Sequence, residues 1–317
     1  MQNHYDVIVI GGGAAGLTAG IYLSRAKVNT LILNEGAVGG QMVLTHEIAN
    51  YPGIESISGY ELARNMKSQA QKFGCTIKSN LKITELDLNS ETKKVTVNNK
   101  DVYTAHAVII ATGGKSRTIG APGEDEFKGK GISYCATCDG DFFQDKEIIV
   151  VGGGNSALEE AVSLTKYASK VTIVHQFDHF QAFEHYVEEA KKNPKINFIM
   201  ESKIIEFTGD EKLTGVKIQH QQTKEITAMD IDGVFIFIGY VPNTEKLEGI
   251  VELNDWKEIL VDKNLATNIP GVFAAGDSIA KRYRQVTTAV ADGTIAALSA
   301  AEFVNNIKKE LLLAQAN

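Results

Sequence analysis

Two cysteines separated by two residues, Cys135 and Cys138, are the side chains of this chain best suited to redox chemistry. A Cys-x-x-Cys pair can close a disulfide within one turn, and a helix start lowers a thiol pKa so that one sulfur is nucleophilic near neutral pH. Asp139 follows directly and places a proton donor beside the sulfur that leaves. The pattern therefore favours a working dithiol with an acid at its side.

A zinc half-site and a structural staple are the other interpretations of this pair. Zinc takes four ligands, and the one further cysteine, Cys75, has no paired histidine spacing near it. A staple that spans two residues closes almost no loop and stabilises little. We expect Cys75 to be a buried free thiol without a role.

The composition of the 317-residue chain is that of a soluble globular protein with two domains, at 44% hydrophobic and 22% charged residues. The net charge of −7 and the lack of a basic stripe give no support to nucleic-acid binding. The start of the chain enters a strand without the pattern of a signal peptide, and no apolar run is long enough to span a membrane. Three cysteines fit a reducing compartment, so we expect a cytoplasmic protein.

The chain begins with a strand, a glycine-rich turn and a helix, an arrangement that positions a ligand at the N-terminus of the helix. The strand is Asp6–Ile10, the helix ends near Arg25, and a second strand follows at 30–33. Glycines in such a turn let the backbone approach a pyrophosphate, which binds at the helix N-terminus. The residues predicted to bind it are Gly11, Gly13, Ala14, Ala15 and Gly16.

The same pattern returns later at a constant offset, with a strand at 147–151, a glycine turn at 152–157, a helix to about Tyr167 and a strand at 170–174. Each unit also ends in an apolar strand that closes on glycine, at Gly113 and at Gly239. We therefore predict an α/β protein of two dinucleotide-binding, Rossmann-like, three-layer domains, the second inserted into the first. The predicted limits are 1–116 with 245–317 for the first domain and 117–244 for the inserted domain, which carries the dithiol.

The chain resembles the low-molecular-weight thioredoxin reductases over essentially its whole length. The matching motifs occur in one order, at residues 11–16, 39–41, 50–53, 111–113, 135–140, 152–160, 239–244 and 271–277. The resemblance implies FAD in the first domain, a homodimer, thioredoxin as the partner, and a domain that swivels so that the dithiol alternates between flavin and protein substrate. It also implies that Cys138 faces the flavin, Cys135 attacks the partner disulfide and Asp139 is the acid.

Further FAD contacts follow from the same comparison. A strand that ends in Gly276-Asp277 suits a carboxylate that accepts from a ribityl hydroxyl. An alanine-rich helix is predicted over 287–303, and the segment Arg284-Gln285-Val286 at its start could aim backbone amides at the ring. The position of the family's ribose-binding acid is Asn34, with Glu35 next, and either can accept a ribose hydroxyl. The other predicted contacts are Gly40, Gln41, Asn50, Thr112 and Gly113.

Phe142 and Phe143 match the hydrophobic patch that grips thioredoxin in the family, and Lys130 stands at a basic partner contact. From spacing alone, two core aromatics and a solvated lysine are an equally good interpretation.

The segment after the second strand of the inserted domain departs from the family. The family has His-Arg-Arg-x-x-x-Arg there, with arginines for the 2′-phosphate of NADPH, whereas this chain has His175-Gln-Phe-Asp-His-Phe-Gln181. Each charge-assisted hydrogen bond contributes about 1.5–3 kcal/mol, so the loss of three weakens NADPH by roughly a thousandfold or more. NADH binding would place an acid at His175, and the nearest is Asp178. Phe177, Phe180 and Phe183 recur every three residues and could fill the vacated pocket or pack as ordinary apolar side chains.

A subgroup of the family in anaerobic bacteria resembles this chain at the altered segment and takes electrons from reduced ferredoxin, which makes ferredoxin the expected donor. Ferredoxins are acidic and are steered by positive patches. The candidate patches are Lys191, Lys192 and Lys195, or Lys281, Arg282 and Arg284, and either could equally be a solvated face.

Three alternatives stay open at this point. NADPH or NADH could be held by other contacts, the protein could be a small-molecule dithiol oxidase that passes electrons to oxygen, or it could be a redox sensor without turnover. The acid Asp139 has no obvious use in a sensor.

Overall fold

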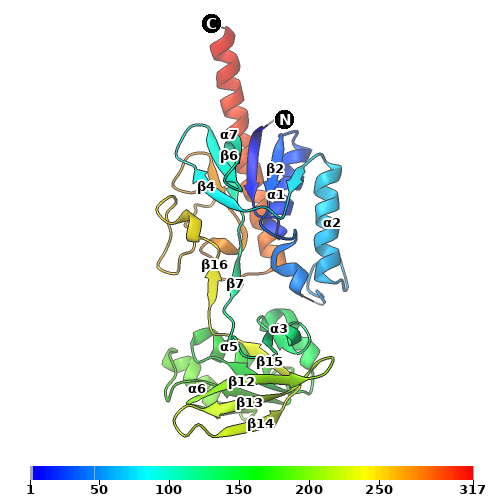
Figure 1. Cartoon of the computed structure of the whole chain (residues 1–317), viewed down its shortest axis with the longest axis vertical. Helices are drawn as coiled ribbons and strands as arrows, with labels where there is room; N and C mark the ends of the chain where they lie inside the picture. The colour runs from blue at the N-terminus through cyan, green and yellow to red at the C-terminus, as the bar shows by residue number, and fades with distance from the viewer. Residues whose placement is uncertain (1–2, 46, 317) are drawn as a thin grey trace. The chain divides into compact units, whose positions relative to one another are not determined.

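The computed structural model describes residues 3–45 and 47–316, so the extreme ends of the predicted first domain, residues 1, 2 and 317, lie outside the described residues. The chain divides into two compact units, residues 1–115 with 241–317 and residues 116–240. Figure 1 labels many of the helices and strands. Residues 241–244, which the sequence assigned to the inserted domain, fall in the first unit because the Asn243 N–H donates to the Gly113 carbonyl at 2.9 Å and Thr244 Oγ1 donates to the Lys257 carbonyl at 2.7 Å.

The first unit is built on a sheet in the order β3-β2-β1-β6-β5-β4, with β17 also paired to β6. Strands β1, β2, β3, β6 and β17 pair in parallel, whereas β4, β5 and β6 pair antiparallel. The strands are β1 (His4–Ile10), β2 (Thr30–Leu33), β3 (Thr76–Lys78), β4 (Ile83–Asp87), β5 (Lys93–Val97), β6 (Asp101–Ile110) and β17 (Val272–Ala274). Residues 7–10 and 107–110 are buried, as expected of central parallel strands covered on both faces.

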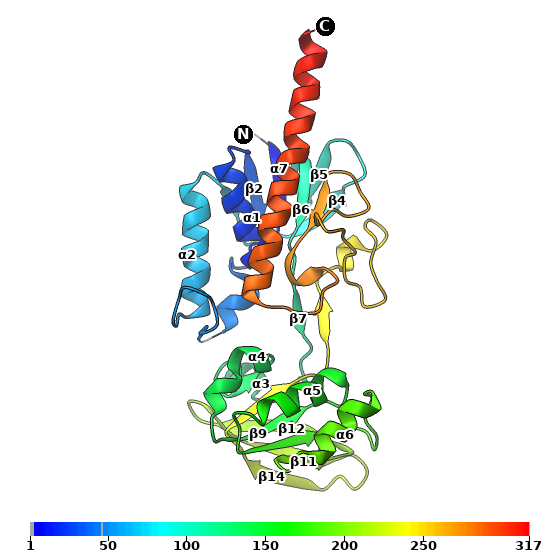
Figure 2. The same ribbon diagram turned by 180° about the vertical axis from the view of Figure 1, so that it is seen from behind.

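The helices of this unit are α1 (Ala14–Arg25), α2 (Gly59–Lys72) and α7 (Val286–Ala316), with 3₁₀ turns η1 (Gly40–Leu44), η3 (Glu245–Leu247) and η4 (Gly276–Ser278). Helix α7 crosses α1 closely, because a Cβ on Gly293 would lie 2.2 Å from the Ala15 carbonyl oxygen. The sequence predicted this helix over 287–303, but it continues to Ala316. Figure 2 shows its last turns projecting beyond the sheet of the first unit, where Leu311 and Leu312 are exposed.

The second unit contains a five-stranded parallel sheet in the order β11-β10-β9-β15-β8 and an antiparallel sheet β12-β13-β14. The strands are β8 (Ile132–Ser133), β9 (Glu147–Val151), β10 (Lys170–Val174), β11 (Ile196–Ile199), β12 (Ser202–Gly209), β13 (Leu213–His220), β14 (Ile226–Asp230) and β15 (Gly233–Ile236). The helices are α3 (Glu124–Phe127), α4 (Ala136–Asp139), α5 (Asn155–Leu164) and α6 (Glu184–Lys192), and η2 spans Gly140–Phe143. The two crossings of the chain between the units, β7 (Gly114–Ser116) and β16 (Tyr240–Pro242), pair as a two-stranded ribbon.

Each unit thus repeats a strand, a glycine turn, a helix and a parallel strand, which confirms the predicted α/β fold with the second dinucleotide-binding domain inserted into the first. In both units the helix begins directly after the turn, at Ala14 and at Asn155. In the part of the chain that the structure describes, no helix is long and apolar enough to cross a membrane.

Candidate active site

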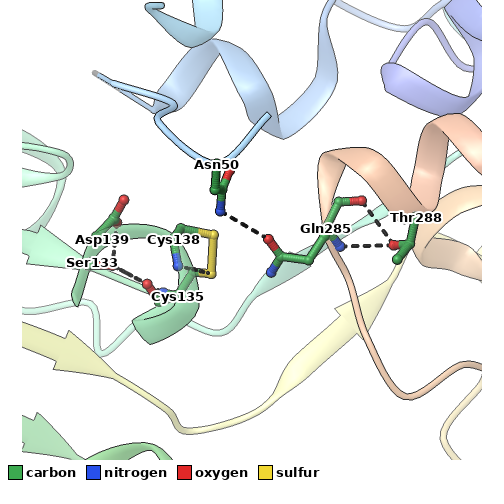
Figure 3. Close-up of a disulfide and its surroundings, with 7 residues drawn as sticks. All are labelled: Asn50, Ser133, Cys135, Cys138, Asp139, Gln285 and Thr288. Atoms are coloured by element: carbon green, nitrogen blue, oxygen red, sulfur yellow. Dashed lines mark hydrogen bonds between the residues drawn. A yellow bond between two sulfur atoms is a disulfide. The ribbon is translucent and has the colours of Figure 1, made fainter. Parts of the chain in front are cut away.

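Cys135 and Cys138 are joined by a disulfide with their Cα atoms 5.3 Å apart (Figure 3). Cys135 caps the N-terminus of the short helix α4, and the Cys138 backbone N–H donates to Cys135 Sγ at 3.2 Å. A donor aimed at this sulfur favours its thiolate once the disulfide is open. This hydrogen bond would favour nucleophilic attack by Cys135 Sγ in the reduced pair.

Asp139 lies at the end of α4 and is held by a side chain that the sequence analysis did not single out. Ser133 Oγ donates to Asp139 Oδ2 at 2.6 Å and accepts from the Cys135 backbone N–H at 3.1 Å (Figure 3). Burial raises the pKa of the Asp139 carboxyl, and the hydrogen bond from Ser133 opposes that rise. A carboxyl with a raised pKa is a better proton donor near neutral pH. The available signal was a hydroxyl two residues before Cys135 in the same motif.

Tyr134, the residue that directly precedes Cys135, is anchored by a buried acid, Glu124. This carboxylate is 3% exposed and accepts from the Tyr134 hydroxyl at 2.7 Å and from the backbone N–H groups of Ile119 and Gly120 at 3.1 and 2.6 Å. Burial raises the pKa of the Tyr134 hydroxyl, so it remains a donor to Glu124. The two residues before Cys135 are therefore both anchored, Tyr134 by Glu124 and Ser133 by its hydrogen bonds to Asp139 and Cys135. No local sequence pattern indicates the role of Glu124.

The predicted partner contacts separate into core and surface. Phe143 packs edge-on against Phe235, with ring centroids 5.0 Å apart, and therefore belongs to the core. Phe142 is 44% exposed and Lys130 is exposed as well. Of the three side chains, two are available to a partner.

The first glycine turn has the shape that a pyrophosphate needs. Gly11 has a φ of +110°, and a Cβ there would lie 2.1 Å from the Ala111 carbonyl oxygen, so only glycine fits between the strands. A Cβ on Gly40 would meet the Gly13 Cα at 3.1 Å, so the two backbones approach each other at the start of α1. Gly16 meets the Gly11 carbonyl in the same way, at 1.9 Å, which packs the helix on the strand.

Asn34 connects this turn to the loop that follows β2. Its Oδ1 accepts from the Gly12 N–H at 2.7 Å, and its Nδ2 donates to the carbonyls of residues 35, 36 and 37 at 3.2, 3.0 and 2.9 Å. Glu35 is exposed, and its Oε1 accepts from the Ile83 N–H at 2.7 Å and pairs with Lys246. Asn34 thus joins the glycine turn to the loop after β2 through backbone groups. The second carboxylate oxygen of Glu35, Oε2, would suit a ribose hydroxyl.

Replacing Asn34 by alanine should destabilise the first unit by about 2–4 kcal/mol, because four hydrogen bonds are lost and buried backbone groups are left unpaired. Urea unfolding followed by flavin release measures the effect. Glu35→Gln is the matched control, since it keeps an acceptor for the Ile83 N–H at an exposed position, and it should change stability by less than about 1 kcal/mol. Unfolding of Asn34→Ala at the urea concentration of the unaltered protein would contradict this role.

The remaining predicted flavin contacts all lie in the first unit. Thr112 Oγ1 is buried and has no hydrogen-bond partner among the described residues, and Gly113 beside it has a φ of +60° with open space at its Cβ position. Asn50 Nδ2 donates to Gln285 Oε1 at 3.4 Å (Figure 3). Gln41 is exposed on η1, and Val286 is the first residue of α7.

Asp277 follows β17 and is partly buried, with a side chain that is 28% exposed. Burial raises its pKa, and Lys281, whose Nζ is 3.4 Å from Oδ1, opposes the rise. Arg284, predicted to serve the flavin through this segment, uses its guanidinium for an ion pair with Glu258 and a 3.4 Å hydrogen bond to the Asp277 carbonyl. The first glycine turn, the partly buried Asp277 carboxylate and the Thr112 hydroxyl, unpaired among the described residues, all lie in the first unit, and they fit a flavin dinucleotide.

The candidate basic patches for an acidic partner are largely occupied by contacts within their own units. Lys281 pairs with Asp292 at 2.7 Å, and Lys192 pairs with Glu188 at 2.9 Å. Lys195 donates to two carbonyls at the end of α5, at 2.8 and 2.9 Å. Neither cluster therefore presents a free row of positive charge.

The second glycine turn faces an aromatic segment. The His175 ring, 4% exposed, lies so close to Gly153 that a Cβ there would be 2.3–2.4 Å from its atoms, and His175 Nε2 has no hydrogen-bond partner in the described part of the chain. Phe180 stacks on His175 with ring centroids 5.7 Å apart, and Phe177 packs edge-on at 5.4 Å. The Gln181 N–H donates to the Gly153 carbonyl at 2.8 Å.

The segment at this turn carries a negative charge at Asp178. Asp178 Oδ1 is 2.6 Å from His179 Nδ1, and this hydrogen bond lowers the pKa of the Asp178 carboxyl, so it is ionised at neutral pH. An exposed carboxylate repels a nucleotide phosphate. Phe183 is 65% exposed and its N–H donates to Asn155 Oδ1 at 2.8 Å, so it does not fill the turn.

Two dinucleotide folds, a flavin cradle and a Cys-x-x-Cys disulfide together define a flavin-dependent disulfide oxidoreductase. The family profile described as pyridine nucleotide-disulphide oxidoreductase matches residues 5–293. The chain is 47% identical over 311 residues to a thioredoxin reductase of Peptoclostridium acidaminophilum, covering 96% of this chain and 98% of the relative. It is 46% identical over 308 residues to one of Listeria monocytogenes, covering 97% and 96%.

Among solved structures, the crystal structure of thioredoxin reductase from Streptococcus pyogenes matches with a TM-score of 0.93 and 39% identity, covering 96% of this chain and all of that one. The chain therefore belongs to the pyridine nucleotide-disulphide oxidoreductase family and, within it, to the low-molecular-weight thioredoxin reductases. Its cofactor is FAD, which the residues of the first unit fit.

Proposed function

We propose that the protein reduces the disulfide of thioredoxin with the dithiol of Cys135 and Cys138, and that its flavin receives electrons from reduced ferredoxin instead of NADPH or NADH. The substrate follows from the family and from the thioredoxin reductases that cover nearly the whole chain. The donor rests on one observation, the aromatic and acidic segment 175–181 at the second glycine turn.

The missing positive charge supports ferredoxin as the donor over NADPH or NADH. Gln176, Phe177 and Gln181 stand at the family's arginine positions, so a 2′-phosphate would lose about 4.5–9 kcal/mol of charge-assisted hydrogen bonding at roughly 1.5–3 kcal/mol each. Asp178 adds repulsion toward any phosphate. His175 at the end of β10 offers no carboxylate for the ribose hydroxyls of NADH. Neither nicotinamide dinucleotide finds its usual recognition groups.

FAD, when bound, can accept single electrons twice and pass two to a disulfide, which makes an iron–sulfur protein a chemically competent donor. The residues that would hold it are the predicted pyrophosphate contacts at residues 11–16 and Gly40. Glu35, Thr112 and Asp277 would contact its ribose and ribityl groups. In the other half-reaction, the Cys135 thiolate attacks the thioredoxin disulfide and Cys138 resolves the mixed disulfide. Asp139 supplies the proton to the thiolate that leaves.

The same proposal includes a cytoplasmic homodimer in which Phe142 and Lys130 contact thioredoxin. The exposure of these two side chains supports the contact, whereas Phe143 packs against Phe235. Sedimentation of the holoenzyme measures the oligomeric state.

The experiment is anaerobic turnover of thioredoxin by the holoenzyme with each donor in turn. We expect thioredoxin thiols to appear with reduced ferredoxin and to remain at background with NADPH or NADH. Turnover with NADPH at micromolar concentration would refute the donor and leave the dithiol chemistry in place. No turnover with any donor, including dithionite, would refute the thioredoxin assignment.

A further inference from the structure

Ser133 forms hydrogen bonds with both the candidate acid, Asp139, and the backbone of the candidate nucleophile, Cys135. It is 4% exposed at the end of β8. Its hydroxyl donates to Asp139 Oδ2 at 2.6 Å, and the same oxygen accepts from the Cys135 N–H at 3.1 Å. A hydroxyl has one proton to donate, and the short contact shows that this proton is directed mainly at the carboxyl, since its other acceptor, the Cys135 carbonyl, is at 3.3 Å.

We propose that Ser133 is a positioning residue for the proton transfer: it occupies Asp139 Oδ2, leaves the other carboxyl oxygen to carry the proton toward the departing sulfur, and ties that carboxyl to the backbone of Cys135. The inference deepens the proposed function, because it rests on the thiol–disulfide exchange at the same dithiol.

The thiol–disulfide exchange between the dithiol and the substrate conserves atoms and electrons. The Cys135 thiolate attacks one sulfur of the substrate disulfide, and a Cys135–substrate bond forms as the substrate S–S bond breaks. The electron pair of the broken bond stays on the second substrate sulfur, which takes the proton of Asp139. The Cys138 thiolate then attacks Cys135 Sγ, the internal disulfide re-forms, and the first substrate sulfur leaves and takes a proton from water. The protein loses two electrons, the substrate gains two, and Asp139 is protonated again from solvent.

Burial and the hydroxyl act in opposite directions on the acid. Burial raises the pKa of the Asp139 carboxyl and keeps it protonated before transfer, whereas the Ser133 hydrogen bond stabilises the carboxylate that transfer leaves. Without the hydroxyl the carboxyl is free to rotate, and its pKa rises further. Glu124 restrains Tyr134 independently of Ser133, so the segment before Cys135 keeps a second anchor when the hydroxyl is removed.

The leaving thiol distinguishes proton transfer from a purely structural role. A disulfide whose thiol is weakly acidic, such as hydroxyethyl disulfide, needs a proton as it leaves, whereas the aromatic thiolate of DTNB leaves without one. The test is single-turnover oxidation of dithionite-reduced, flavin-loaded protein by each disulfide, without thioredoxin or ferredoxin. Ser133→Ala should slow the reaction with hydroxyethyl disulfide by roughly 10–100-fold, part of the full contribution of a general acid, and change the DTNB reaction by less than about threefold.

Three further measurements make the result specific. Ser133→Thr should restore most of the rate with hydroxyethyl disulfide, and Ser133→Ala should move the alkaline limb of the pH profile to higher pH. In an Asp139→Asn background, Ser133→Ala should have no further effect, because both substitutions act on one proton transfer.

Equal slowing with both disulfides, additivity with Asp139→Asn, or an unchanged rate would each overturn the role of Ser133. Failure of the unaltered reduced protein to react with either disulfide would instead refute the dithiol chemistry on which the proposed function depends.

Discussion

Replacing Cys138 by serine should abolish catalytic reduction of thioredoxin and trap the protein as a mixed disulfide with it. Cys135 would still attack, because its Sγ receives the backbone hydrogen bond at the start of α4, but no second thiol within the pair could release it. Turnover should fall by on the order of a thousandfold or more, as for loss of a covalent nucleophile that acts in a unit. The second thiol of thioredoxin can reverse the attack, so the dithionite-reduced variant is mixed with a thioredoxin that has its second cysteine replaced by serine and its first cysteine activated as a disulfide with a small thiol. Mass spectrometry should then show the covalent complex.

Cys75→Ala is the matched control for this experiment. Cys75 is buried in the first unit, and burial raises the pKa of its thiol to about 11, so it is protonated and inert at neutral pH. The control should keep normal turnover and form no adduct. An adduct that survives in Cys135→Ser but not in Cys138→Ser would show that the two sulfurs have the opposite roles.

Restoring arginines at positions 176, 177 and 181 should create NADPH-dependent reduction of the flavin. The second glycine turn and helix α5 are intact in this chain, so the substitutions Gln176→Arg, Phe177→Arg and Gln181→Arg supply the charge that the site lacks. Three charge-assisted hydrogen bonds of about 1.5–3 kcal/mol each predict roughly a thousandfold or more tighter binding of NADPH. The rate of flavin bleaching at increasing NADPH concentration measures the gain.

The control replaces the same three residues by alanine, which removes the aromatic ring of Phe177 without adding charge. It should leave the flavin unreduced by NADPH, and the arginine variant should prefer NADPH over NADH because the added groups face the 2′-phosphate. If the alanine variant gained NADPH reduction as well, steric filling by Phe177 rather than missing charge would be the cause.

The fold was predicted from local sequence patterns, above all the two glycine-rich turns. Each glycine turn lies between a buried strand and a helix within about thirty residues, and the repeat at constant offset predicts the second domain from the first. The helix α7 was predicted too short because its last turns lack a buried face, and sequence periodicity detects helices through that face.

The side chains that complete the candidate site were harder to predict, because tertiary contacts select them. Glu124 contacts Tyr134, which lies ten positions later in the sequence, and Asn34 after β2 contacts Gly12 after β1. Phe142 and Phe143 are adjacent in sequence, yet one faces solvent and the other Phe235, which spacing alone does not distinguish. The lysines of the candidate patches have ion-pair and capping partners that are visible only in the folded chain.

Rapid mixing of the oxidised, oxygen-free holoenzyme with each reductant tests the central claim most directly. Reduced ferredoxin should bleach the flavin absorbance within the time of turnover. NADPH or NADH at about 50 μM should leave it unchanged in that time, because this concentration is roughly fiftyfold above a micromolar Kd and well below the roughly millimolar Kd expected without the three charge-assisted hydrogen bonds. Saturable bleaching by NADPH with a micromolar Kd would contradict the account, because it would require a phosphate site that segment 175–181 does not provide.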